Sequence, residues 1–159
     1  MPSRAEAFRS ALRGPWLAFT PVATRREVWP QLALFLAWLA GTLLGAWIVP
    51  SPRGHGSHEQ LGLPACSVMA LLHRPCPGCG LTTSVSATLR GRLAEAFRAH
   101  PFGPPLYALA TFGAALALWG WSRRLRVSVD TPPMNALVAA VLGAFLLYGA
   151  ARFVLWLPE

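Results

Sequence analysis

Residues 30–49 read PQLALFLAWLAGTLLGAWIV and carry no charged side chain. As an α-helix, a stretch of about 20 apolar residues crosses the hydrocarbon core of a bilayer. Trp29, Trp38 and Trp47 are spaced so that both membrane–water interfaces receive a tryptophan, a residue type enriched there. The polar region before this stretch is long, and no small-residue cleavage site follows it. We therefore expect a retained transmembrane helix, not a cleaved signal peptide.

Two further apolar stretches follow in the C-terminal half of the chain. Residues 102–121 are uncharged, and residues 134–157 are interrupted only by Arg152. Because this arginine lies near the end of its stretch, its guanidinium can extend to the membrane interface. The sequence therefore predicts three transmembrane helices.

The overall composition agrees with a membrane protein. The chain is 54% hydrophobic and only 13% charged, whereas a soluble domain has about 25% charged residues. We expect an all-α polytopic fold with a polar arm at residues 1–29 and one membrane domain at residues 30–157. Within the arm, residues 5–19 have the composition of a short amphipathic helix on the membrane surface.

The positive charge comes entirely from arginine, and it indicates orientation in the membrane. The net charge is +8, but the arginines form no compact basic face with aromatic base-stacking residues, so we expect no nucleic-acid partner. The arm contains five arginines and the RRLR stretch at 123–126 contains three, while six are spread over longer segments. The positive-inside rule then predicts a cytoplasmic N-terminus and places residues 50–101 on the outer face.

The segment between the first two spans is expected to form a helical hairpin over residues 64–100. Residues 64–74 form a short apolar stretch, with Pro64 in the first turn of a helix. After a proline- and glycine-rich turn, residues 81–98 show apolar side chains every four residues, and Pro101 ends the helix. This second helix is expected to lie on the membrane or to enter it. Its apolar stripe comprises Leu81, Val85, Leu89, Leu93 and Phe97.

The cysteine-containing stretch CSVMALLHRPCPGCGLTTSVSATLRGRLAEAFRAHPFG, residues 66–103, resembles the signature of an uncharacterised family of small bacterial membrane proteins. This family is a domain of unknown function, so the resemblance implies a bacterial cytoplasmic membrane but no reaction. Two positions depart from the family pattern: Thr83 replaces its usual arginine and His100 its usual asparagine. The matching positions are Cys66, Cys76, Pro77, Cys79, Gly80, Leu81, Thr82, Gly91 and Pro101.

One interpretation of the three cysteines is a metal site, most simply zinc. A Cys-Pro-Gly-Cys turn lets two thiolates converge on one ion, and Cys66 would supply a third ligand. A structural zinc needs four ligands, commonly three cysteines and one histidine. The candidate histidines are His55, His58, His73 and His100.

A second interpretation is a membrane thiol–disulfide oxidoreductase that uses Cys76 and Cys79. Their two-residue spacing is that of redox-active cysteine pairs. Cys79 precedes a helix, so the helix dipole is expected to lower its pKa. Cys66 would then act as the resolving thiol.

The third interpretation, which we expect to describe the protein, is structural. A disulfide from Cys66 to Cys76 or Cys79 would pin the short helix to the turn, in which Pro77 and Gly80 set the backbone. Thr82 lies in a TTS stretch expected to cap the following helix. The expected function is that of a small non-enzymatic membrane subunit or scaffold whose cysteine cluster holds a disulfide or a metal ion.

The first span also carries a pattern typical of helix–helix contact. Gly41 and Gly45 are four residues apart, a spacing that permits close approach of two helices. The partner could be another helix of the chain, a second copy or another membrane protein. The spans hold no acidic residue, which argues against proton-coupled transport.

Overall fold

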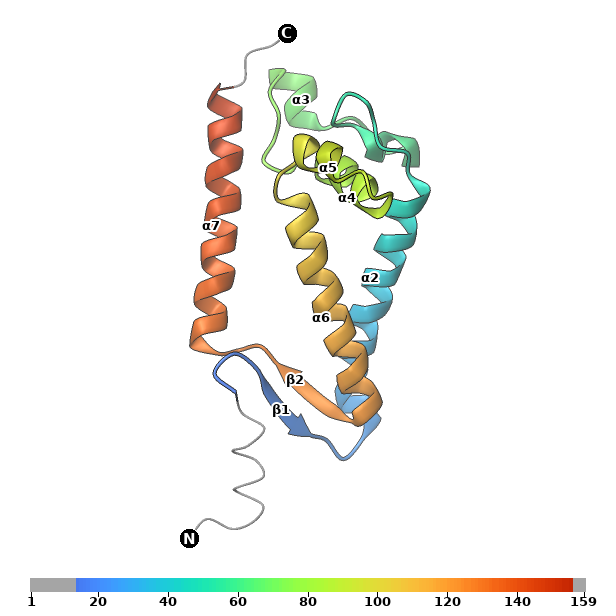
Figure 1. Ribbon diagram of the computed structural model, residues 1–159, viewed down its shortest axis with the longest axis vertical. Helices are drawn as coiled ribbons and strands as arrows, with labels where there is room; N and C mark the ends of the chain where they lie inside the picture. The colour runs from blue at the N-terminus through green and yellow to red at the C-terminus, as the bar shows by residue number, and fades with distance from the viewer. Residues whose placement is uncertain (1–13, 156–159) are drawn as a thin grey trace. The chain divides into compact units, whose positions relative to one another are not determined.

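The computed structural model describes residues 14–155, and Figure 1 shows their arrangement by element. Most of the described chain is helical, with two short strands. In chain order the elements are β1 (Ala18–Pro21), the 3-10 helix η1 (Arg25–Val28), α2 (Trp29–Trp47), the 3-10 helix η2 (Ser57–Leu61), α3 (Ser67–Leu72), α4 (Leu81–Leu89), α5 (Leu93–Ala99), α6 (Gly103–Arg123), β2 (Leu125–Ser128) and α7 (Pro132–Leu155).

The chain divides into two compact units, which are described separately below. Unit 1 contains the described residues up to Trp38 together with Thr111–Val141. Unit 2 contains Leu39–Ala110 and the described residues from Leu142 onward. The boundary falls within helices α2, α6 and α7.

Helices long and apolar enough to span a membrane occur at two of the three positions that the sequence predicts. Two stretches, Arg25–Trp47 and Pro132–Leu155, are long and apolar enough to cross a bilayer. Helices α5 and α6 meet this criterion together, with a bend of 107° between them, so by length and composition the described residues hold two candidate spans, or three if this pair is one span. The apolar helices indicate a lipid-bilayer environment.

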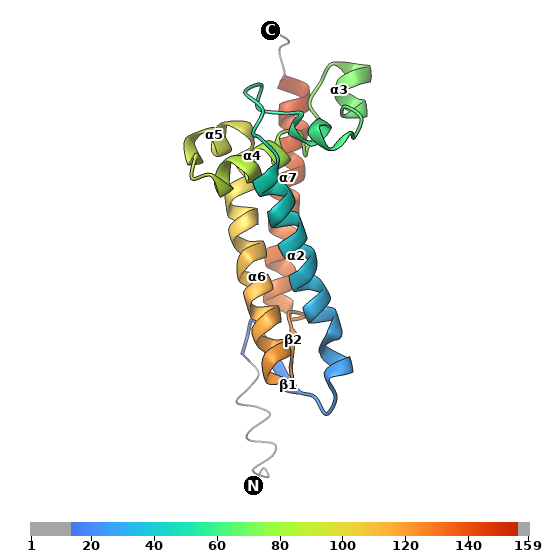
Figure 2. The same ribbon diagram turned by 90° about the vertical axis from the view of Figure 1, so that its right-hand side faces the viewer.

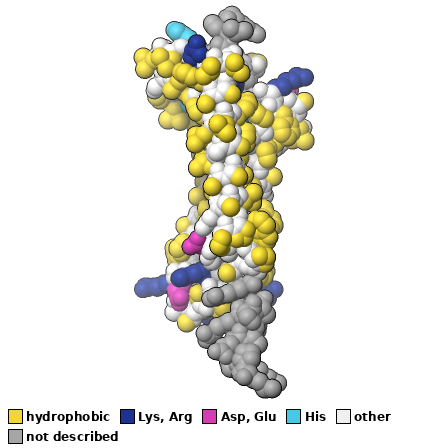
Figure 3. Space-filling model, turned by 90° about the vertical axis from the view of Figure 1, so that its left-hand side faces the viewer, with side chains coloured by type: hydrophobic (Ala, Val, Ile, Leu, Met, Phe, Trp, Pro, Cys, Tyr) yellow, Lys and Arg dark blue, Asp and Glu magenta, His cyan; other side chains and the backbone are white. Residues whose placement is uncertain are grey.

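Helix α7 presents an apolar surface rather than a polar one. Figure 3 shows hydrophobic side chains along its outward face. Leu147 and Leu155 are 73% and 75% exposed, which would be unfavourable in water and is favourable in lipid.

Unit 1 contains a two-stranded antiparallel sheet that the sequence analysis did not predict. β1 pairs with β2 in a register that places Phe19 opposite Val127 and Pro21 opposite Leu125. The expectation of an amphipathic helix over residues 5–19 is wrong for its described part, because Ala18 and Phe19 are in β1. The rest of that stretch, residues 5–13, lies outside the described residues.

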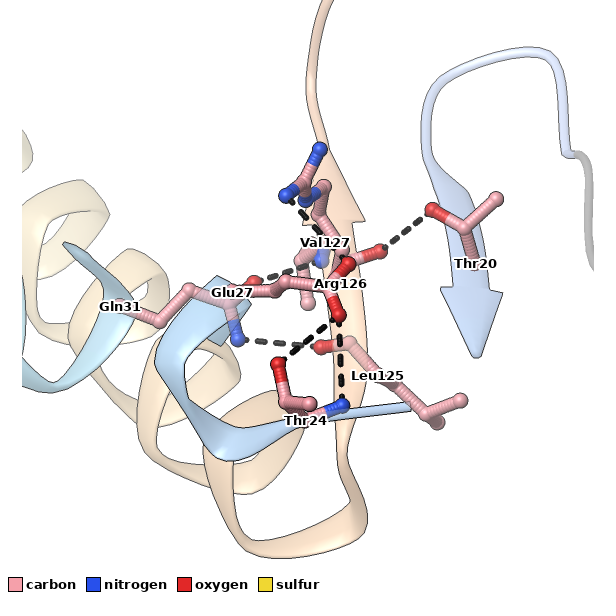
Figure 4. Close-up of polar contacts among 7 residues, drawn as sticks. All are labelled: Thr20, Thr24, Glu27, Gln31, Leu125, Arg126 and Val127. Atoms are coloured by element: carbon pink, nitrogen blue, oxygen red, sulfur yellow. Dashed lines mark hydrogen bonds and ion pairs between the residues drawn. The ribbon is translucent and has the colours of Figure 1, made fainter. Parts of the chain in front are cut away.

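The side chain of Gln31, in the first turn of α2, holds this sheet in place (Figure 4). Its Nε2 donates a hydrogen bond to the Leu125 carbonyl at 3.0 Å, and its Oε1 accepts one from the Val127 N–H at 2.6 Å. An isolated two-stranded ribbon is only marginally stable in water. Two bonds from one helix side chain to the backbone of β2 therefore help to explain why so short a sheet forms. Gly120 of α6 leaves the room this requires, because a Cβ there would meet Gln31 Nε2 at 2.7 Å.

In unit 2, the single helix expected over residues 81–98 is broken into α4 and α5, which Figure 2 shows side by side. The chain reverses at Gly91, whose φ is +72°. The Gly91 N–H donates to the Thr88 carbonyl at 3.0 Å, and the Arg92 N–H donates to the Ala87 carbonyl at 3.0 Å. This is a Schellman ending, which glycine favours. The apolar stripe with four-residue spacing therefore does not lie on one helix.

The short helix is also smaller than expected. α3 has six residues and begins at Ser67, with Cys66 as its N-cap, so Pro64 does not start it. α5 ends at Ala99, as the position of Pro101 predicted.

The C-terminal end of α2 packs on α4 within unit 2. A Cβ on Gly45 would meet Leu89 Cδ1 at 3.0 Å, whereas a Cβ on Gly41 would have nothing within 4 Å. Arg90 Nη2 donates to the Ala46 carbonyl at 2.8 Å, which satisfies a terminal carbonyl of α2. Of the two glycines, only Gly45 is used for close helix contact inside the described chain.

Candidate functional site

The three cysteines line one pocket of unit 2, with a volume of about 490 Å³. The loop after α2, helix α3, the cysteine turn and the start of α4 form its walls. The polar side chains of this pocket are Arg53, His55, His58, Glu59, Thr82 and Thr83, in addition to the cysteines Cys66, Cys76 and Cys79.

Of the three thiols, Cys66 is the one whose pKa is lowered. It is the N-cap residue of α3, and its side chain is partly exposed to the pocket. The Met69 N–H donates a hydrogen bond to its sulfur, which lowers the pKa of Cys66. Burial opposes this effect, while the Cys76 thiol and the Val68 N–H add to it. A lowered pKa increases the thiolate fraction, which is the nucleophilic form.

Cys76 and Cys66 line the same pocket, and each thiol affects the ionisation of the other. Burial raises the pKa of Cys76, and the neighbouring Cys66 thiol raises it further. Of the three cysteines, Cys66 and Cys76 are thus the contacting pair. All three are free thiols in this structure.

Cys79 is the innermost thiol, with 7% of its surface exposed. Its N–H donates to the Cys76 carbonyl at 2.9 Å, which closes the turn. The expectation that the following helix lowers the pKa of Cys79 is wrong: burial raises it, and the neighbouring thiols Cys76 and Cys66 raise it further. Burial removes water that would stabilise the charged thiolate.

Within residues 14–155, no three cysteine, histidine or acidic side chains are placed so that they could hold one metal ion. This holds although Cys66, Cys76 and Cys79 share a pocket with two histidines, His55 and His58. Burial and the neighbouring Arg53 lower the pKa of His55, which favours its neutral form.

His100, one of the expected fourth ligands, has a structural position instead. Its ring is fully buried, with Nε2 at 3.0 Å from the Pro77 carbonyl and Nδ1 at 3.3 Å from the Phe102 N–H. Because Nδ1 must accept from the amide, Nε2 carries the proton and donates to Pro77. Both ring nitrogens therefore form hydrogen bonds, and the bond to Pro77 ties the ring to the cysteine turn.

The cysteine turn makes two close contacts with the surrounding backbone, at Gly80 and at Pro77. Gly80 has φ of +91°, and a Cβ there would lie 2.5 Å from the Ala99 carbonyl oxygen and 2.7 Å from that of Gly54. Pro77 packs against Gly149 of α7 so closely that any Cβ at Gly149 would overlap it. The turn is therefore enclosed by backbone on both sides.

Arg152 of α7 completes this enclosure. Its Nη1 donates to the Cys79 carbonyl at 2.8 Å. The guanidinium, which we expected to extend to the membrane interface, thus has a partner in the cysteine turn. A charged residue within an apolar stretch is costly unless it has a partner, so the position of Arg152 in the sequence already indicates one.

Thr82 lines the pocket, but α4 has no side-chain cap, and its N-cap residue is Gly80. The neighbouring Thr83 is buried, and its hydroxyl lies 2.7 Å from that of Ser57. This contact joins the loop after α2 to α4, and nothing in the local sequence pattern pointed to it.

Comparison with known proteins gives one result. The model of the family described as a protein of unknown function (DUF2752) matches residues 66–114. This match confirms the resemblance to an uncharacterised family, and the matched segment includes all three cysteines. No curated protein and no solved structure matches the chain.

Proposed function

We propose that this protein performs thiol–disulfide exchange in a membrane, with Cys66 as the attacking thiol and Cys76 as the resolving thiol. The observation that carries the proposal is the contact between these two thiols at an open pocket, where backbone N–H groups favour the thiolate of Cys66. The proposed pair therefore differs from the Cys76–Cys79 pair expected from spacing alone.

The exchange takes place in two displacement steps. The Cys66 thiolate attacks one sulfur of a disulfide substrate, which forms a mixed disulfide and releases the first substrate sulfur as a thiolate. Cys76 then loses its proton to water and attacks the Cys66 sulfur, which releases the second substrate thiolate. The substrate disulfide is reduced to two thiols, and the Cys66 and Cys76 thiols are oxidised to one disulfide. A dithiol donor must reduce this disulfide before another turnover.

We infer from their contacts that Cys66 is more mobile than Cys76. Cys76 belongs to the turn that Arg152, Gly149 and His100 hold. Cys66 belongs to the six-residue α3, a short helix flanked by loops. Local movement of α3 would let Cys66 reach a substrate sulfur and then return to the fixed Cys76.

The proposal can be tested with dithiodipyridine, a neutral disulfide that releases a chromophore at each displacement. Wild-type protein should rapidly release two equivalents per chain. Cys76→Ser should release one and retain a mixed disulfide on Cys66, while Cys66→Ser should lose the rapid phase. Cys79→Ser is the matched control and should behave as wild type. A rapid phase that depends on Cys79 and not on Cys66 would refute the assignment.

A structural role for the same pair is the second candidate, and the small size of α3 favours it. A Cys66–Cys76 disulfide would close a short loop and contribute about 3 kcal/mol by the chain-entropy relation. The protein would then be a non-enzymatic membrane subunit or scaffold. In that case the disulfide should resist mild reductants, and forced reduction should lower the melting temperature in detergent.

We further propose that the pocket faces the outer side of a bacterial cytoplasmic membrane. The distribution of arginine supports this, because unit 1 has five described arginines in or next to its small sheet. Four arginines of unit 2 instead form hydrogen bonds within that unit, namely Arg74, Arg90, Arg92 and Arg152. A membrane-impermeant maleimide should label Cys66 in intact cells. Labelling only after lysis would indicate the opposite orientation.

A further inference from the structure

The cysteine pocket adjoins a second pocket that is rich in arginine. This second pocket also has a volume of about 490 Å³, and it lies between the loop after α2 and helices α4 and α5. Arg53 and Thr83 line both pockets. A ligand that extends past Arg53 would therefore contact the cysteine pocket and the arginine pocket together.

The charges of the arginine pocket do not balance. Its charged side chains are Arg53, Arg92, Glu95 and Arg98. Glu95 is already paired with Arg92, with Oε2 at 2.6 Å from Nη2 and Oε1 at 2.8 Å from Nε. Among residues 14–155, no ion pair joins Arg53 or Arg98 to an acidic side chain. The charges of Arg53 and Arg98 thus remain available in the pocket that adjoins the thiols.

Glu59 is the acidic side chain on the cysteine side of Arg53, and it limits where an anion can bind. It lines the cysteine pocket but not the arginine pocket. A negative group is therefore favoured beyond Arg53, towards Arg98, and disfavoured directly beside Glu59. The neutral part of a ligand would then occupy the cysteine pocket, where Ala65, Met69 and Ala70 provide apolar walls.

We propose that the substrate of the exchange reaction is an anionic disulfide, one that carries a carboxylate or a similar group a few bonds from its sulfur atoms. The anion would bind Arg53 and Arg98, while the disulfide lies over Cys66. Arginine suits this role because its planar group can donate two parallel hydrogen bonds to a carboxylate. This inference rests on the proposed thiol–disulfide exchange.

The test compares two aromatic disulfides of opposite electrostatic character. Dithiobis(nitrobenzoate) carries carboxylates, whereas dithiodipyridine is neutral. For the protein we measure the rate with the anionic probe divided by the rate with the neutral probe, and we divide this ratio by the same ratio for N-acetylcysteine amide. The result should be roughly 5 or more, as two nearby charges would produce. The preference should weaken in about 0.5 M salt, because ions screen exposed charges.

Two variants locate the effect. The double variant Arg53→Gln/Arg98→Gln should lose the preference for the anionic probe, while Arg123→Gln, an exposed arginine of unit 1, is the matched control and should retain it. The neutral probe reports whether each variant is folded and reactive. Equal preference in wild type and in the double variant would overturn the inference and leave the proposed exchange intact. If the wild-type protein shows no rapid reaction with the neutral probe, the proposed exchange itself is refuted.

Discussion

Replacement of Gly80 by alanine should destabilise the cysteine turn by an amount that the structure allows us to estimate. The residue has φ of +91°, a left-handed conformation that costs an L-residue about 1–2 kcal/mol. The added Cβ would also lie 2.5 Å from the Ala99 carbonyl oxygen and 2.7 Å from that of Gly54. The backbone shifts that accommodate such an overlap typically cost a further 1–3 kcal/mol or so. The total is about 2–5 kcal/mol.

Gly62→Ala is the matched control for this experiment. Gly62 also has a positive φ, +74°, but a Cβ there would have nothing within 4 Å. Its replacement should therefore cost only the conformational strain, about 1–2 kcal/mol. Thermal unfolding in detergent measures both variants, and on the scale of soluble domains of similar length the Gly80 variant should melt roughly 5–20 °C below wild type. Equal losses in the two variants would refute the claim that the turn is enclosed by backbone.

Three further predictions concern other parts of the site and of unit 1. Gly149→Ala should lower the melting temperature, because its Cβ would overlap the proline of the cysteine turn, whereas Gly143→Ala on the same helix has open space and should be neutral or stabilising; the reverse order would contradict the packing. Gln31→Leu should destabilise unit 1 by about 1–3 kcal/mol, since it leaves backbone groups of β2 without their partners, and hydrogen exchange at β2 should accelerate. Unchanged exchange would show that the sheet does not depend on this side chain. Alkylation of single-cysteine variants over a pH series should give a midpoint below the ordinary cysteine value for Cys66 and above it for Cys79. Midpoints in the opposite order would contradict the electrostatics of the pocket.

The pH dependence of stability follows from the same pKa directions. The folded-state pKa of Cys66 is lowered, so ionisation of this thiol stabilises the fold once the pH exceeds the unfolded pKa, and this contribution disappears as the pH falls through the folded pKa. Cys79 has the opposite sign: burial raises its pKa, so its contribution is present below the unfolded pKa and disappears as the pH rises through the folded pKa.

The helices of membrane length were predictable from the sequence because they depend only on local composition. The expected span at residues 30–49 corresponds to α2, Trp29–Trp47, and the expected span at 134–157 corresponds to α7, Pro132–Leu155. An uncharged apolar stretch has few alternatives to a helix in lipid, since its backbone groups must bond to one another. Residues 156 and 157 of the last span lie outside the described residues.

The break between α4 and α5 could also have been found in the sequence. Gly91 stands between two arginines after a helical stretch, which is typical of a glycine C-terminal cap. The four-residue spacing of apolar side chains, by contrast, continues across this glycine and favours one helix. The small sheet of unit 1 was harder to predict, because its strands are separated by about a hundred residues and depend on a glutamine of α2.

The candidate site was predictable in its location but not in its detail. The sequence identified Cys66, Cys76 and Cys79 as one cluster, and the pocket contains all three. The redox interpretation paired Cys76 with Cys79 and the structural one paired Cys66 with Cys76 or Cys79. In the structure the side chain of Cys79 is buried, and Cys66 lies beside Cys76. The roles of Arg152 and His100 depend on contacts between segments far apart in the chain. A single sequence contains no such information on distance.

A redox titration in native membranes can show whether Cys66 and Cys76 form the exchanging pair. Membranes would be equilibrated over a series of thiol–disulfide ratios, trapped by alkylation, and analysed by mass spectrometry for each cysteine. We expect a Cys66–Cys76 disulfide that forms and disappears reversibly while Cys79 remains a thiol. A disulfide that links Cys76 to Cys79, or three thiols that never oxidise, would contradict this expectation.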